Sequence, residues 1–179
     1  MHDCIKNLSI IKSELELISS KNKFNIFPNI IAVSKTFPMK EILPLLNHGH
    51  LHFGENKVQE SLEKWENILK DFKNIKLHMI GKLQTNKVKF AVKLFHYIHS
   101  LDNLKLAEKI SKEQSKIGKN LKIFIQVNIG EEKQKSGILP EDLETFLKIC
   151  LNKLNLNIVG LMCLPPNDNN SIDYFTTLK

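Results

Sequence analysis

The prediction of the fold starts from the stretch Ile30-Ile31-Ala32-Val33-Ser34-Lys35-Thr36-Phe37-Pro38. Within this stretch an apolar run changes to a polar turn. The four apolar residues predict a fully buried strand, and Pro38 suits the first position of a helix. Lys35 then lies at the carboxyl end of the strand, the edge where parallel α/β sheets bind their ligands. With apolar residues behind it, a desolvated and nucleophilic amine is one interpretation of Lys35, but this stretch alone favours the alternative of a solvated loop lysine.

Strand and helix patterns alternate along the rest of the chain. An amphipathic helix is predicted over Ile5–Ser20. The predicted strands are Ile30–Val33, His50–Phe53, Lys76–Ile80, His96–Ser100, Leu121–Asn128 and Asn157–Leu164. The predicted helices are Met39–Asn47, with Pro44 expected to kink it, Lys57–Phe72, Gln84–Leu94, Asn103–Ile117, capped by Asp102, Pro140–Cys150 and Ser171–Lys179.

Six βα units with short connections predict an α/β fold with a parallel sheet. No glycine-rich phosphate fingerprint follows any of the predicted strands. We therefore favour a TIM-type (β/α)8 barrel, represented by about six units after an N-terminal helix, over a dinucleotide-binding fold. The whole chain, 1–179, is predicted to be one domain.

Composition narrows the classes of partner. The formal net charge is +7, but every basic residue is lysine and arginine is absent. Specific nucleic-acid recognition favours the bidentate guanidinium, so no specific nucleic-acid partner is expected. No apolar run reaches the ~20 residues of a membrane span, which predicts no membrane partner.

The N-terminal segment and the cysteines both indicate the compartment of the protein. Met1–Asn7 lacks the apolar centre and cleavage site of a signal peptide. Cys4, Cys150 and Cys163 are odd in number and have no CxxC spacing, which predicts reduced thiols. These features predict a cytoplasmic protein.

Polar residues and glycines follow the predicted strands, so one mouth of the barrel would collect them. They are Lys35; Gly54, Glu55 and Asn56; Gly81, Lys82 and Gln84; Ser100 and Asp102; Asn128, Glu131, Lys133, Lys135 and Gly137; and Met162 with Cys163. Simpler alternatives remain for some of them. Glu55 and Asn56 are also suited to capping a helix, and Gly81 to a turn.

Two other kinds of site were considered. His48, His50 and His52 alternate and would share one face of a strand, but no carboxylate at fixed spacing accompanies them, so no metal site is predicted. Cys163 has no base placed beside it by the sequence, and a buried inert thiol is the favoured interpretation.

Five motifs together resemble one known family. They are Ala32-Val33-Ser34-Lys35-Thr36-Phe37-Pro38, Phe53-Gly54-Glu55-Asn56-Lys57-Val58-Gln59-Glu60, His78-Met79-Ile80-Gly81-Lys82-Leu83-Gln84-Thr85-Asn86-Lys87, Gln126-Val127-Asn128-Ile129 with Lys135-Ser136-Gly137, and Gly160-Leu161-Met162. In this order they closely resemble the pyridoxal-phosphate homeostasis protein family, small relatives of the alanine racemase N-terminal barrel.

The resemblance implies a barrel of fold type III among pyridoxal 5'-phosphate (PLP) proteins, with PLP held as a Schiff base on Lys35. It implies a noncatalytic role in vitamin B6 homeostasis. By the same resemblance, Asn56, Gly81, Asn128 and Met162 are wall positions of the cofactor site. Lys135 matches a motif lysine and is a candidate second amine for the aldehyde.

A barrel without a second domain leaves its mouth open, which favours storage and transfer of PLP over turnover. The predicted partners are PLP and PLP-dependent apo-enzymes, and the chain is expected to be a monomer or a weak homo-oligomer. Two alternatives stay open. One is a PLP-dependent, racemase-like enzyme acting on amino acids, and the other is a degenerate family member that no longer binds PLP.

The sequence departs from the family at two places. Lys57 stands where the family usually has an aromatic residue. Relatives also continue with a seventh and an eighth βα unit, which carry the phosphate-binding loops and an arginine near the pyridine nitrogen. We therefore expect a C-terminally incomplete barrel with two unpaired strand edges and weakened cofactor binding, and we favour truncation over completion by oligomerisation.

Overall fold

The computed structural model describes residues 2–22, 27–132, 134–166, 168 and 171–179. Its centre is a six-stranded parallel sheet in the order β1-β2-β3-β4-β5-β6. The strands are β1 (Ala32–Val33), β2 (His52–Glu55), β3 (Lys76–Met79), β4 (Tyr97–Leu101), β5 (Lys122–Val127) and β6 (Asn157–Cys163). Each strand pairs with the next one along the chain, as successive βα units require, so the predicted α/β architecture is confirmed.

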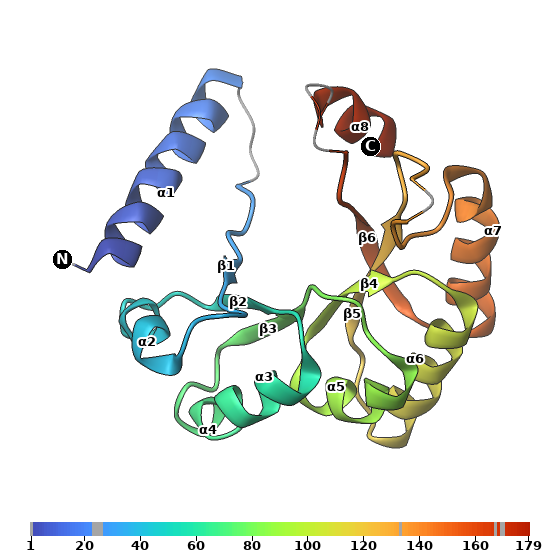
Figure 1. Cartoon of the computed structure of the whole chain (residues 1–179), viewed down its shortest axis with the longest axis horizontal. Helices are drawn as coiled ribbons and strands as arrows, with labels where there is room; N and C mark the ends of the chain where they lie inside the picture. The colour runs from blue at the N-terminus through green and yellow to red at the C-terminus, as the bar shows by residue number, and fades with distance from the viewer. Residues whose placement is uncertain (1, 23–26, 133, 167, 169–170) are drawn as a thin grey trace.

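One helix precedes the first strand, one follows the last, and the helices between the strands cover one side of the sheet. The helices are α1 (Asp3–Asn22), α2 (Met39–Asn47), α3 (Val58–Trp65), α4 (Ile68–Asp71), η1 (Thr85–Lys87), α5 (Val88–Leu94), α6 (Leu104–Lys116), η2 (Pro140–Asp142), α7 (Leu143–Lys148), the π-helical η3 (Ile149–Lys153) and α8 (Ser171–Leu178). Figure 1 shows α2 to α7 following one another around the outer side of the curved sheet.

The hydrophobic core lies between the sheet and this helical layer. Phe53, Leu77, Ile98 and Ile123 stand on four neighbouring strands, and all four are fully buried. They belong to one buried cluster with apolar residues of α3, α5 and α6, including Trp65. Alternation along each strand therefore sends one set of side chains to the helices and the other set to the opposite face.

Among the described strands, β1 and β6 each pair on one side only, so the sheet is open. Val33 on β1 is 47% exposed and Val159 on β6 is 42% exposed. The prediction that Ile30–Val33 is a fully buried strand was therefore wrong. Only Ala32 and Val33 form the strand, and its position at the sheet edge leaves one side uncovered.

Three local predictions about helix termini also need correction. Asn103, and not Asp102, caps α6, because the Asn103 side-chain oxygen accepts a hydrogen bond from the Leu106 N–H at 2.9 Å. Pro38 is the residue before α2 and not its first residue. The single helix predicted over Lys57–Phe72 is divided into α3 and α4.

Pro44 lies inside α2 as predicted. A proline has no N–H to donate within a helix. No helix in the described part of the chain is long and apolar enough to cross a membrane.

The face of the sheet opposite the helices carries a row of histidines. Nδ1 of His52 lies 2.9 Å from Nε2 of His78, and Nδ1 of His78 lies 2.9 Å from Nε2 of His99. Tyr97 stacks on His78, and Phe124 stacks on His99, with ring centroids 4.2 and 4.4 Å apart. Aromatic and imidazole rings thus run across β2 to β5 at hydrogen-bond and stacking distances.

Burial opposes the protonation of these imidazoles. It lowers the pKa of His78 to about 3, with smaller contributions from the neighbouring His99, His52 and His96. Burial likewise lowers the pKa of His99 to about 4, and lowers that of His96 to about 4 with help from Lys119 and Lys76. The fold therefore favours neutral imidazoles in this row and at His96, which precedes β4.

We expect acid to weaken the fold through these histidines. The unfolded chain binds their protons near pH 6.5, whereas the folded chain resists protonation until about pH 4 for His96 and His99 and about pH 3 for His78. Stability is therefore fully present above pH 6.5 and falls as the pH decreases, with a slope of at most about 1.4 kcal/mol per pH unit for each histidine. Urea unfolding at pH 7.5 and 5.5 measures this loss.

Carboxylates titrate mostly below pH 5.5, so the difference in stability between pH 7.5 and pH 5.5 comes chiefly from the histidines. Imidazole resonances followed by NMR provide the independent check. A His78 resonance that titrates near pH 6.5 in the folded protein would contradict the account.

Candidate functional site

The carboxyl edge of the sheet carries the predicted site residues. Lys35 follows β1 by two residues, Asn56 follows β2 directly, Gly81 follows β3 by two residues, and Asn128 follows β5 directly. Met162 lies in the last part of β6, paired in register with Gln126. The parallel strands thus bring five positions, far apart in the sequence, to one edge of the sheet.

Lys35 is exposed in a turn in which the Phe37 N–H donates to the Ser34 carbonyl oxygen at 3.1 Å. Among the residues that the structure describes, nothing forms a hydrogen bond or ion pair with its ammonium. The exposure of Lys35 agrees with the solvated loop lysine and not with a desolvated amine, because β1 is an edge strand and leaves the turn open to solvent. The amine is accessible to a ligand approaching from solvent.

A buried carboxylate holds the residue next to Lys35. Glu55 is 1% exposed, and its Oε1 accepts hydrogen bonds from Ser34 Oγ at 2.8 Å and from Trp65 Nε1 at 2.9 Å. Lys64 Nζ donates to the same oxygen at 3.0 Å and to the Ser34 carbonyl oxygen at 2.8 Å. Ser34 is therefore bound through both its hydroxyl and its carbonyl, which fixes the start of the Lys35 turn.

This network differs from the sequence expectation. Glu55 was considered as a helix cap, but α3 has Lys57 at its N-cap and no capping side chain. Glu55 instead links the ends of β1 and β2 to α3. The sequence carries a signal for this role, since a glutamate that continues a buried strand needs partners, and Lys64 and Trp65 follow it on the next helix.

Gly81 lets two loops approach closely. A Cβ atom at this position would lie 2.4 Å from the Asn56 carbonyl oxygen and 2.7 Å from the Asn56 Cα. Real Cβ atoms do not come so near to backbone atoms. The absence of a side chain at Gly81 therefore sets the spacing between the loops that follow β2 and β3.

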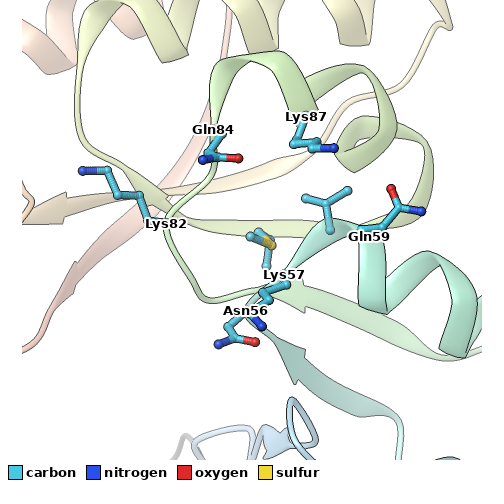
Figure 2. Close-up of a pocket in the computed structure, with 8 residues that line it drawn as sticks. Asn56, Lys57, Gln59, Lys82, Gln84 and Lys87 are labelled. Atoms are coloured by element: carbon cyan, nitrogen blue, oxygen red, sulfur yellow. The ribbon is translucent and has the colours of Figure 1, made fainter.

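One cavity collects two of the predicted wall residues, Gly81 and Asn128, and the candidate second amine, Lys135. It has a volume of about 260 Å³ and lies among Gly81, Asn128 and Lys135, together with Ile80, Lys82, Gln126, Val127, Ser136 and Leu164. Lys35, Asn56 and Met162 do not line it. Asn56 instead lines a separate pocket at the start of α3 (Figure 2).

The loop after β5 is tightly built. Asn128 Nδ2 donates to the Glu132 carbonyl oxygen at 3.0 Å, and Asn128 Oδ1 accepts from the Glu132 N–H at 3.2 Å. Lys135 forms an ion pair with Glu132 and donates to the Pro165 carbonyl oxygen at 3.2 Å. The Lys135 ammonium is thus engaged by acceptors, in contrast to that of Lys35. Lys133, also considered at this mouth, lies outside the described residues.

The histidine and cysteine alternatives gain no support. His48 ends α2 and β2 begins only at His52, so the three alternating histidines do not share a strand. In the described part of the chain, no cluster of three histidine, cysteine, aspartate or glutamate residues has the geometry to hold a metal ion. Burial raises the pKa of the Cys163 thiol, which disfavours the nucleophilic thiolate.

The chain is similar to known proteins of one family. The family model described as alanine racemase, N-terminal domain, matches residues 8–177. The chain is 36% identical to the pyridoxal phosphate homeostasis protein of Haemophilus influenzae over 165 residues, 91% of this chain and 70% of that protein. It is 40% identical to the protein of the same name from Aquifex aeolicus over 153 residues, 84% of this chain but only 66% of that protein.

Solved structures agree with this assignment. The structure of PipY from Synechococcus elongatus with PLP bound is 32% identical, has a TM-score of 0.73, and is covered over 91% of this chain and 76% of that chain. An alanine racemase from Clostridium difficile has a TM-score of 0.65 at 18% identity, over 90% of this chain and 42% of that chain. At this identity the racemase shares the fold alone.

Removing the charge of Glu55 is expected to destabilise the protein strongly. The substitution Glu55→Gln leaves Lys64, whose side chain is 13% exposed, without its anion, and breaking a largely buried ion pair in this way costs about 3 kcal/mol. Urea unfolding measures the loss. Glu60→Gln is the matched control, since Glu60 pairs with Lys57 on the surface, and an equal effect of both substitutions would contradict the role of Glu55.

Gly81→Ala is expected to destabilise by about 2 kcal/mol, because the new methyl group must displace the Asn56 backbone. Gly160→Ala is the control, since its methyl group would meet only the Phe124 ring at 3.1 Å, and a side chain yields more easily than backbone. Urea unfolding of the two variants compares them. A loss at Gly81 no greater than that at Gly160 would show that the close approach of the loops is unimportant.

Proposed function

The chain belongs to the pyridoxal phosphate homeostasis proteins of the alanine racemase N-terminal domain family, and we propose that it binds PLP covalently through the Lys35 amine. PLP would be held there as a Schiff base, serving intracellular vitamin B6 homeostasis. Because the chain spans 70% and 66% of the length of two curated relatives, the activity of the whole protein is part of this proposal.

The accessible amine of Lys35 is the observation that carries the proposal. It lies at the carboxyl edge of a parallel sheet, exposed, and the described residues leave it without an ion-pair partner. The preceding Ser34 is fixed by Glu55 and Lys64, so the turn that presents the amine has a defined start. These features suit an amine that must meet a ligand entering from solvent.

The residues present fit the aldehyde end of the cofactor. When bound, PLP supplies an aldehyde carbon, which forms a C=N bond with the lysine nitrogen as water leaves. The cavity of about 260 Å³ lined by Gly81 and Asn128 lies at the same edge of the sheet. Gly81, Asn128, Asn56 and Met162 are proposed to contribute to the wall of the cofactor site.

We propose a storage and transfer role in place of catalysis. Lys35 is exposed, whereas catalysis by a cofactor needs an enclosed site and a placed acid or base. The relatives at 36% and 40% identity carry the name of homeostasis proteins. The proposed recipients are PLP-dependent apo-enzymes in the cytoplasm, and the proposed assembly is a monomer or a weak homo-oligomer.

The substitution Lys35→Ala is expected to abolish the visible absorbance band that appears when PLP is added to the protein. Borohydride reduction, proteolysis and mass spectrometry then locate the label in the wild-type chain, where we expect Lys35 to predominate. Lys135, the candidate second amine, should carry less label because its ammonium is held by Glu132 and the Pro165 carbonyl.

Lys40→Ala is the matched control, since it removes another exposed lysine from the same region and should leave the band unchanged. A wild-type chain without the band would refute PLP binding. Label spread evenly over surface lysines would show that Lys35 has no special role, and turnover of an amino acid would favour the racemase-like alternative.

A further inference from the structure

A second pocket, separate from the Lys35 turn, lies between the start of α3 and the segment that follows β3. Its volume is about 400 Å³, and its lining residues are Asn56, Lys57, Val58, Gln59, Met79, Lys82, Gln84 and Lys87. Figure 2 shows Gln84 and Lys87 on the segment after β3, facing Asn56, Lys57 and Gln59 at the beginning of α3, with Lys82 at one end. A pocket of this size suits a small organic molecule.

The lining is cationic and rich in hydrogen-bond donors. It contains three lysines and three side-chain amides, and none of its described residues is acidic. Lys57 pairs with Glu60 at 2.6 Å on the surface. For Lys82 and Lys87, the described part of the chain supplies no ion pair. Two lysines without an ion pair among the described residues therefore border one cavity.

The position of Lys57 adds to this charge. It is the N-cap residue of α3, and no side chain caps the helix there. A cation at the positive end of a helix dipole is unfavourable, whereas an anion is favourable. An anion beside Lys57, Lys82 and Lys87 would offset the unfavourable interaction of the Lys57 cation with the N-terminus of α3.

The pocket also has an apolar side. Met79 and Val58 are both buried in the protein and contribute to the lining. A free inorganic anion would satisfy the lysines but leave this apolar surface without a partner. An anion joined to a carbon skeleton uses both parts of the pocket.

We propose that this pocket binds a small phosphate monoester. The phosphate, which carries nearly two negative charges and several acceptor oxygens at neutral pH, would lie among the three lysines. The organic group would cover Met79 and Val58. This site does not depend on the proposed function, because Lys35 does not line the pocket, although Lys82 borders both this pocket and the cavity of about 260 Å³.

Phenyl phosphate is a suitable probe, because it has no aldehyde and cannot react with an amine. Isothermal titration calorimetry of the full chain should detect its binding, and inorganic phosphate should bind several-fold more weakly. The double substitution Lys82→Gln, Lys87→Gln should weaken binding of phenyl phosphate by about tenfold or more, because it removes two charge-assisted contacts.

Lys105→Gln with Lys112→Gln is the matched control. It removes the same net charge from two exposed lysines of α6 and should leave the affinity within about twofold, since surface charges there are screened from the pocket. Circular dichroism checks that both double variants remain folded. Lys35→Ala should also bind phenyl phosphate normally, which separates this site from the one proposed for PLP.

Four results would overturn the inference. The first three are no heat of binding with phenyl phosphate, an equal loss of affinity in both double variants, or equal affinities for phenyl phosphate and inorganic phosphate. The second result would show that the probe is attracted only by the net charge of the chain and not by this pocket. A loss of binding in Lys35→Ala alone would place the probe at the other site and would equally refute this one.

Discussion

The burial of the Glu55 carboxylate constrains the part of the structure that bears the candidate site. A carboxylate in the interior is costly unless it is paired and hydrogen-bonded, and here three donors, one from the turn after β1 and two from α3, meet at one of its oxygens. Ser34, Lys64 and Trp65 must therefore stay together for Glu55 to remain buried. As a consequence, the short edge strand β1 is attached to β2 and to α3 by more than its few backbone hydrogen bonds.

The two faces of the sheet have different physical roles. The face toward the helices is apolar and fully buried, and it supplies the packing that holds the βα units together. The opposite face carries the hydrogen-bonded histidines and their stacked aromatic partners, whose protonation the fold opposes. The carboxyl edge, where the loops meet, is then free to carry Lys35 and the two cavities without disturbing the apolar core.

The sequence predicted the order of elements and the position of Lys35, because the alternation of strand and helix patterns and the place where a strand turns polar are local features. It did not predict that Asn103 and not Asp102 caps α6, since that choice depends on backbone angles. It also missed the row from His52 to His99, which exists only through the register of neighbouring strands. The exposure of Val33 and Lys35 depends on which strands lie at the sheet edges, and no local pattern records this.

We infer that the buried Glu55 carboxylate positions the Lys35 turn for reaction with an aldehyde. The most direct test is the rate at which PLP becomes attached to Lys35 in Glu55→Gln, measured by stopped-flow absorbance at low temperature, where circular dichroism shows that the variant is folded. The account predicts a slower reaction than in the wild-type chain, with the rate of Glu60→Gln unchanged. An equal rate in the folded Glu55→Gln variant would contradict it.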